Sequence, residues 1–76
     1  MKRVRLDSTS IASIGFEPRK HELEIEFRES GDVYLYLGVP PEEHAAFMAA
    51  ESKGEYLNQV FKPRGYRYIV KRRGRS

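Results

Sequence analysis

Cations and tyrosines alternate near the C-terminal end of this 76-residue chain, in the segment RGYRYIVKR. Residues 62–76 contain seven lysines and arginines and no acidic residue. Cations can contact the phosphates of single-stranded nucleic acid, and aromatic rings can stack on its bases. The pattern therefore predicts a nucleic-acid-binding segment, with contacts from Lys62, Arg64, Tyr66, Arg67, Lys71, Arg72 and Arg73. The alternative is an edge strand whose tyrosines pack on the core while its arginines are solvated.

A second Tyr-x-Tyr pair, Tyr34 and Tyr36, lies in the strand-like run VYLYL. Alternate residues of a strand point to the same face, so the two rings can form a stacking platform for bases. They can also fill the core, with their hydroxyls reaching polar partners at its rim. The other face of this run is apolar as well, so the pattern alone does not decide between the two.

The stretch ESKGEYLN predicts a helix start and, with it, a candidate anion site. Serine at the cap with glutamate three residues later is a capping box, and backbone N–H groups at a helix start attract anions. The site would comprise Ser52, Lys53, Gly54 and Asn58. A plain helix cap is the alternative, and we favour it. Asparagine is unfavourable inside a helix, so we expect Asn58 to bond a neighbouring loop or a ligand.

The chain offers few residues for catalysis. Nucleophilic catalysis needs an activated serine or cysteine beside a base, but the chain has no cysteine and only two histidines, His21 and His44. No Gly-rich phosphate loop occurs, and Glu43-His44 is the nearest approach to a metal-ligand pair. We therefore expect no enzyme activity, no cofactor and no metal.

Length and charge limit the partners that the chain can have. Seventy-six residues make one domain with a small core. The net charge is +3, but the basic residues concentrate in 62–76, which favours an anionic partner there. The lack of cysteine favours a reducing cytoplasm, and no apolar run approaches the roughly 18 residues of a membrane helix. We expect RNA, tRNA-like or single-stranded, or alternatively a protein as partner, and no membrane.

The spacing of apolar residues predicts an α+β fold. In HELEIEF they alternate with glutamates, as in a strand with one buried face, and short turns to its neighbours favour an antiparallel meander. We expect Pro63 to end the second of two helices, because proline disfavours the helical state in the residue before it, here Lys62. We predict a three-stranded meander, then two helices, then a short C-terminal strand that can join the sheet edge. The strands are Ile11–Phe16, His21–Phe27 and Val33–Leu37, the helices Pro41–Ala50 and Lys53–Phe61, and the last strand Tyr66–Val70.

These elements also predict the division of the chain and the solvated face of the sheet. Residues 1–7 would be a disordered or loosely docked arm, residues 8–70 the domain, and residues 71–76 a basic flexible tail. The helices would cover the face of Leu23 and Ile25, leaving the glutamate face in water. Since acidic groups repel phosphates, nucleic acid would bind away from that face.

Three pieces of the chain together resemble the KTSC domain, a family named for C-terminal extensions of lysyl-tRNA synthetase that also occurs as small stand-alone bacterial proteins. The pieces are SIASIGFEPRKHELEIEF, YLYLGVPPEEH and ESKGEYLN. The family pattern combines S-x-x-I-x-x-I-G-aromatic, Y-x-Y, V-P and A-x-S-x-G-x-[YF]-[FL]-N. The matching positions are Ser8, Ile11, Ile14, Gly15, Phe16, Tyr34, Tyr36, Val39, Pro40, Ala50, Ser52, Gly54, Tyr56, Leu57 and Asn58.

The resemblance implies an α+β domain in which the motif aromatics Tyr34, Tyr36 and Tyr56 belong to the core, because the residue between the first two is often polar in the family. It also suggests RNA binding, from the association with a tRNA synthetase. Our leading hypothesis is a small non-enzymatic RNA-binding module that uses its basic C-terminal segment. The alternative is a protein-interaction module that uses an exposed sheet edge or the apolar face opposite the first two tyrosines.

Overall fold

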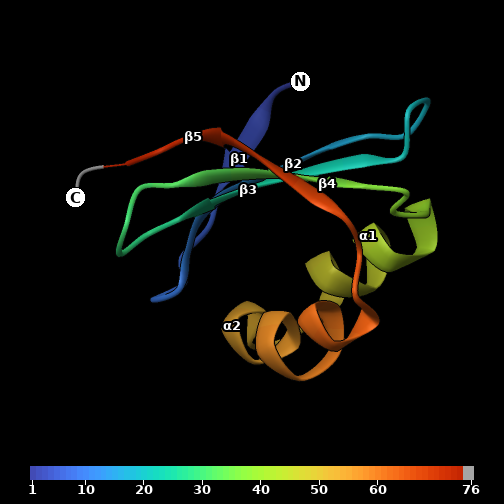
Figure 1. Cartoon of the computed structure of the whole chain (residues 1–76). Coiled ribbons are helices and arrows are strands. Elements are labelled where there is room, and N and C mark those ends of the chain that lie inside the picture. The colour runs from blue at the N-terminus through green and yellow to red at the C-terminus, as the bar shows by residue number, and fades with distance from the viewer. Residues whose placement is uncertain (75–76) are drawn as a thin grey trace.

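One layer of the protein is an antiparallel sheet, and a second layer of helices covers one of its faces (Figure 1). The computed structural model describes residues 1–74. Within this range the sheet has five strands, and each pairs antiparallel with the next along the chain. The strands are β1 (Arg3–Arg5), β2 (Ile11–Glu17), β3 (Glu22–Phe27), β4 (Val33–Leu37) and β5 (Tyr68–Arg72).

Two helical stretches follow β4 before the chain returns to the sheet. Helix α1 spans Pro41–Ala49. Helix α2 (Lys53–Tyr56) continues without a break into a π-helical turn, η1 (Leu57–Phe61), and a 3₁₀ turn, η2 (Lys62–Arg64). The α+β architecture with two helices is thus as predicted.

Pro63 does not end the second helical stretch, contrary to the prediction. It lies inside η2, and Lys62 before it keeps the right-handed helical angles φ −59° and ψ −43°, so the proline does not force that residue out of the helical region. The stretch ends instead at Gly65, from which the chain turns back toward β5.

The predicted three-stranded meander is only the centre of the sheet. The C-terminal strand is present, but it spans Tyr68–Arg72 rather than Tyr66–Val70. Strand β1 was not predicted, because the three residues RVR are too few to show a period. The sheet therefore extends beyond both predicted domain borders, into the residues assigned to an arm and to a tail. Arg75 and Ser76 of that tail lie outside the described residues.

Gly15 allows β1 to pack closely against β2. It lies opposite Arg3 in the pairing register, and a Cβ atom at this position would lie 2.8 Å from the carbonyl oxygen of Lys2. A side chain here would therefore push β1 away from the sheet. The close backbone contact explains why a glycine stands inside an otherwise regular strand.

The core lies between the sheet and the helices. Leu23 and Ile25 of β3 lie opposite Tyr36 and Tyr34 of β4, so these four side chains share the face that the helices cover. Phe47 of α1 packs against this face. The complete buried cluster comprises Ile11, Ile14, Leu23, Ile25, Tyr36, Val39, Phe47, Leu57 and Phe61.

Candidate nucleic-acid interface

Arg64 and Tyr66, two of the predicted nucleic-acid contacts, bind a buried carboxylate. Glu43 of α1 is only 6% exposed. Arg64 Nε donates to Glu43 Oε1 at 2.6 Å, and the Tyr66 hydroxyl donates to the same oxygen at 2.8 Å. The Tyr56 hydroxyl of α2 donates to Oε2. These four residues, the Glu43 cluster, join both helices to the segment before β5.

The hydrogen bonds of the Glu43 cluster stabilise a charge in a buried position. Burial by itself raises the pKa of a carboxyl group, but the donors Tyr56, Tyr66 and Arg64 outweigh it and hold the pKa of Glu43 below its ordinary value. Burial and then the neighbouring carboxylate raise the pKa of Tyr66 to about 12. Removing one member of such a buried, bonded group is strongly destabilising, so the cluster is part of the fold.

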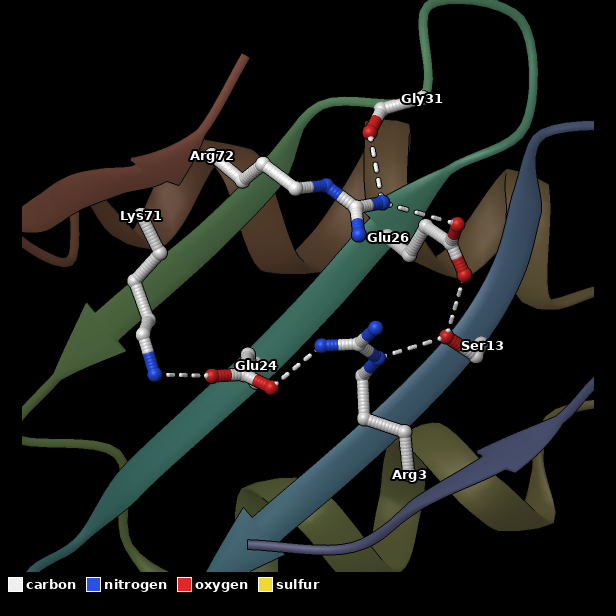
Figure 2. Close-up of polar contacts among 7 residues, drawn as sticks. All are labelled: Arg3, Ser13, Glu24, Glu26, Gly31, Lys71 and Arg72. Carbon is white, nitrogen blue, oxygen red and sulfur yellow. Dashed lines mark hydrogen bonds and ion pairs between the residues drawn. The ribbon is translucent and has the colours of Figure 1, made fainter. Parts of the chain in front are cut away.

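Lys71 of β5 and Arg3 of β1 converge on a second buried carboxylate, on the face of the sheet away from the helices (Figure 2). Glu24 of β3 is 3% exposed. Lys71 Nζ lies 2.9 Å from Glu24 Oε2, and Arg3 Nη1 lies 2.6 Å from Oε1. Burial raises the pKa of Glu24, but these two cations outweigh it, and the pKa lies below its ordinary value. The two edge strands are thereby tied to the central strand.

Arg72 joins the same face through Glu26 (Figure 2). Its Nη2 atom lies 3.3 Å from Glu26 Oε2 and donates to the Gly31 carbonyl at 3.2 Å. The Ser13 hydroxyl donates to Glu26 Oε1 at 2.8 Å and accepts from Arg3 Nε at 2.9 Å. The bond from Ser13, followed by the nearby arginines, lowers the pKa of Glu26. The polar groups of this face thus form one connected network.

The prediction that the glutamate face lies in water and repels phosphates is wrong for Glu24. Side chains from β1 and β5 cross the intervening strands, and their alkyl stems cover its carboxylate. The pairing register places five cations and four glutamates on this face: Arg3, Arg5, Arg67, Lys71 and Arg72 with Glu17, Glu22, Glu24 and Glu26. The outer face therefore carries a surplus of positive charge within residues 1–74.

The cations on and beside β5 remain open to solvent although most are paired. The side chains of Lys71, Arg72 and Arg73 are 51%, 57% and 75% exposed. Arg73 lies 3.8 Å from Asp32, a loose contact. Arg67 is exposed and forms no ion pair with any residue in the described part of the chain. These four cations, the β5 cation row, are accessible to an anionic ligand.

An aromatic groove opens on the opposite side of β5, between the sheet and the η1 turn. Its volume is about 730 Å³. Side chains of β4 and β5 form one wall, side chains of η1 and η2 form the other, and hydroxyl-bearing loop residues lie at the rim. The residues used below are Tyr34, Tyr36, Tyr68, Asn58, Phe61 and Lys62.

The tyrosines of the groove differ in burial. Tyr36 is 6% exposed and belongs to the core, and burial raises its pKa to about 12. Tyr34 is partly buried, and its ring stacks on that of Tyr68 with centroids 4.8 Å apart and planes 11° from parallel. Tyr68 is 53% exposed. The exposed ring is thus Tyr68, which was not among the predicted contacts, although the repeated Tyr-x-Tyr spacing pointed toward it.

Two polar side chains extend from the helical wall of the groove. Lys62 Nζ lies 6.0 Å from the centroid of the Phe27 ring. Asn58 is exposed and makes no side-chain hydrogen bond to any residue among 1–74, so the expected bond to a neighbouring loop does not form. It stands on a π-helical turn, a distortion that is frequent at functional sites. Both groups can therefore contact a ligand in the groove.

The predicted anion site at the start of α2 is occupied by contacts within the protein. Ser52 Oγ accepts the N–H of Glu55 at 3.3 Å, and Lys53 Nζ donates to the carbonyl at the C-cap of α1 at 2.8 Å. A Cβ atom on Gly54 would lie 2.9 Å from Ser10 Oγ, so this glycine lets the loop before β2 pack against the helix. The geometry is that of a helix cap.

A family model matches most of the chain: the KTSC domain, over residues 7–66. The chain belongs to the KTSC domain family. An uncharacterized protein of Stutzerimonas stutzeri (strain A1501) is 52% identical over 68 residues, which cover 90% of this chain and 94% of that protein. A protein of Tsukamurella paurometabola is 39% identical over 59 residues, which cover 78% of this chain and 87% of the relative.

The fold of this KTSC domain also matches a solved structure. The crystal structure of a KTSC domain protein from Yersinia pestis superposes with a TM-score of 0.84 at 42% sequence identity, covering 91% of this chain and 94% of that one. The resemblance that the motifs indicated is thereby confirmed.

Several residues of the KTSC pattern have local structural roles in this chain. Ser8 Oγ accepts the N–H of Ile11 at 3.2 Å and so shapes the loop that enters β2. Gly15 and Gly54 permit close contacts with β1 and with the same loop. Asn58 differs from these residues, because it faces the groove with no partner in the described chain.

The histidines and carboxylates of the described residues can be compared with the requirements of a metal site. Within residues 1–74 no cluster of three or more His, Asp or Glu side chains is placed to bind a metal ion. The ring of His44 stacks on that of Phe16 with centroids 4.6 Å apart, and burial lowers its pKa. In the same range no helix is long and apolar enough to cross a membrane.

Proposed function

We propose that this KTSC domain protein is a small non-enzymatic module that binds single-stranded RNA along the open edge of β5. The observation that carries the proposal is the β5 cation row, whose paired side chains remain at least half exposed. Cations that neutralise phosphates release bound counterions, which drives binding. Phosphates would contact Arg67, Lys71, Arg72 and Arg73.

Two carboxylates of the outer face, Glu24 and Glu26, are paired with cations and oppose this binding little. Glu24 is buried and bonded to two cations, so it presents little charge to an approaching phosphate. A guanidinium has five N–H donors, so Arg72 can keep its bond to Glu26 while it contacts a phosphate. The ion pairs therefore position the cations and leave N–H donors available for phosphates.

The proposal reassigns two of the residues predicted from the sequence. Arg64 and Tyr66 act in the Glu43 cluster and support the edge strand instead of contacting RNA. We choose RNA over DNA because KTSC domains also occur beside lysyl-tRNA synthetase. A cytoplasmic setting fits a chain without cysteine. The packing of His44 on Phe16 supports a non-enzymatic role.

Salt-dependent binding of a fluorescein-labelled 12-nucleotide single-stranded RNA, followed by anisotropy, tests the proposal. With four phosphate contacts, affinity should fall about 50-fold between 50 and 200 mM NaCl. The double variant Arg67→Gln/Arg73→Gln should bind more weakly and with a shallower salt slope. Lys2→Gln removes an exposed cation beside the opposite edge strand and should bind like the wild type. Salt-independent binding, or equal losses in both variants, would contradict the proposal.

A protein partner is the second candidate, favoured by one observation. Ile69 of the edge strand β5 is 52% exposed, and exposed edges can pair with a strand of another protein. Such binding would depend little on salt and would be weakened by Ile69→Lys, which leaves RNA affinity intact or raises it.

A further inference from the structure

We infer that the aromatic groove holds one unpaired nucleobase of the bound RNA, with Tyr68 as its stacking surface. This inference rests on the proposed function and adds a contact to a base. The groove lies on the other side of β5 from Ile69 and Arg67. None of the four cations of the β5 cation row lines the groove, but Arg73 lies 3.8 Å from Asp32, which does. One strand passing over the edge of β5 can therefore place phosphates at the row and a base in the groove.

Tyr68 has the exposure and the support that a stacking residue needs. Its ring is 53% exposed, yet its position is set by the nearly parallel Tyr34 ring at 4.8 Å and by Tyr36 at 5.5 Å. Tyr34 in turn contacts Phe27 edge-on at 5.1 Å. A base placed on Tyr68 would extend an existing stack, so little side-chain entropy is lost on binding.

The groove also provides polar groups suited to a base. The Asn58 amide has donors and an acceptor, no partner among residues 1–74, and a position on the wall facing the tyrosines. Amide groups match the donor–acceptor edges of bases. Hydroxyl groups of Thr9, Ser10 and Ser30 lie in the same lining.

Charge at the groove suits a neutral base better than a phosphate, because the carboxylates of Glu29 and Asp32 belong to its lining together with Lys62. Lys62 brings an ammonium group to the helical wall. On the sheet side, the Asp32 carboxylate accepts the Gly74 N–H at 2.7 Å and lies 3.8 Å from Arg73, so its charge is offset within the protein. A volume of about 730 Å³ lies in the range of sites that enclose small ligands, so one nucleoside fits.

The test compares a single-stranded heptauridylate with an abasic heptamer of the same backbone, at 50 mM NaCl, by competition anisotropy. Wild type should bind the base-containing strand from about 5-fold to about 100-fold more tightly, the range expected for one stacked base. Tyr68→Ala should lose this preference, and Tyr68→Phe should keep it. Ile69→Ala alters an equally exposed side chain on the opposite face and should also keep it.

Two results would overturn the inference while the proposed function stands: equal, salt-dependent binding of both heptamers by wild type, or a base preference that persists in Tyr68→Ala. Absence of salt-dependent binding to either heptamer would contradict the proposed function itself. Asn58→Ala, which alters an exposed and unbonded side chain, supplies a second variant. It should change the ranking among U, C, A and G heptamers without changing the salt slope.

Discussion

Tyr66 and Tyr68 are two tyrosines one residue apart in the same cationic segment, and they have different roles. The hydroxyl of Tyr66 donates to buried Glu43, and its ring packs against Phe61 with centroids 5.2 Å apart. Tyr68 has more than half of its surface in water and stacks only on other tyrosines of the groove. The first tyrosine belongs to the fold and the second to the candidate interface.

The arginines that precede these two tyrosines show the same division. Arg64 bonds to Glu43, whereas Arg67 forms no ion pair within residues 1–74. Each half of the segment has one arginine and one tyrosine, Arg64 with Tyr66 and Arg67 with Tyr68, so residue composition does not determine their roles. What differs is whether a buried carboxylate from a distant part of the chain lies within reach of the side chain.

The largest expected effect comes from removing the carboxylate of Glu43, which accepts hydrogen bonds from Arg64 and Tyr66. Glu43→Ala leaves two tyrosine hydroxyls and a guanidinium without their common acceptor and should lower the free energy of unfolding by about 3 kcal/mol. Urea denaturation measures this loss. Glu42→Ala, an exposed neighbour on the same helix, should cost less than about 1 kcal/mol. Similar losses in the two variants would remove the structural role of the Glu43 cluster.

Removing single hydroxyl groups separates the two tyrosines directly. Tyr66→Phe should lower the free energy of unfolding by about 1.5 kcal/mol, because it deletes one hydrogen bond to a charged acceptor. Tyr68→Phe should leave stability nearly unchanged. RNA affinity should be unaltered in Tyr66→Phe when it is measured at a temperature at which the variant is fully folded. A larger stability loss for Tyr68→Phe would reverse the assignment.

Acid should weaken the fold through the buried carboxylates. The pKa values of Glu24 and Glu43 lie below their ordinary value of 4.5, so their contribution is complete above pH 4.5 and is lost as the pH falls through the lower folded values. The lowered pKa of His44 removes stability over a separate range, beginning below its ordinary value of 6.5. Urea midpoints at pH 7, 5.5 and 3 resolve the two ranges.

The same acid titration in a Glu43→Gln variant provides the control. This variant should be less stable than wild type at pH 7 and should lose less between pH 5.5 and 3, because one of the carboxylates with a lowered pKa is absent. If the urea midpoint of the variant fell between pH 5.5 and 3 by as much as that of the wild type, Glu43 would not be held ionised by its donors.

The smallest effect distinguishes the two arginines. Arg67→Gln should reduce the slope of log affinity against log salt by about 0.7, the value for one phosphate contact with a single strand. Arg64→Gln should leave this slope unchanged while lowering the urea midpoint. Anisotropy titrations at four salt concentrations measure both slopes. Equal salt slopes for the two variants would contradict the assignment of Arg67 to RNA binding and Arg64 to the fold.

Much of the fold could be predicted because it depends on local patterns. The alternation in HELEIEF identified β3 and its buried face, and the Pro-Pro-Glu-Glu start identified α1. β1 escaped prediction because three residues carry no period, and its place in the sheet depends on the close contact with Gly15. The π-helical turn escaped because nothing in its sequence LNQVF distinguishes it from ordinary helix.

The candidate site was less predictable because its determinants are far apart in the sequence. Lys71 and Glu24 are separated by 47 positions and Arg64 and Glu43 by 21, so no local pattern pairs them. The groove likewise joins β3, β4, β5, η1, η2 and three loops. Sequence could indicate which residue types carry the chemistry, but only the packing shows which of them remain free for a ligand.

The most direct measurement of the central claim is an amide chemical-shift titration of the ¹⁵N-labelled protein with single-stranded heptauridylate at low salt. The account predicts the largest shifts at Arg67–Arg73 and at Asn58, with Lys53, Gly54, Glu43 and Tyr56 little affected. Shifts confined to the start of α2, or an absence of shifts along β5 at saturating RNA, would contradict it.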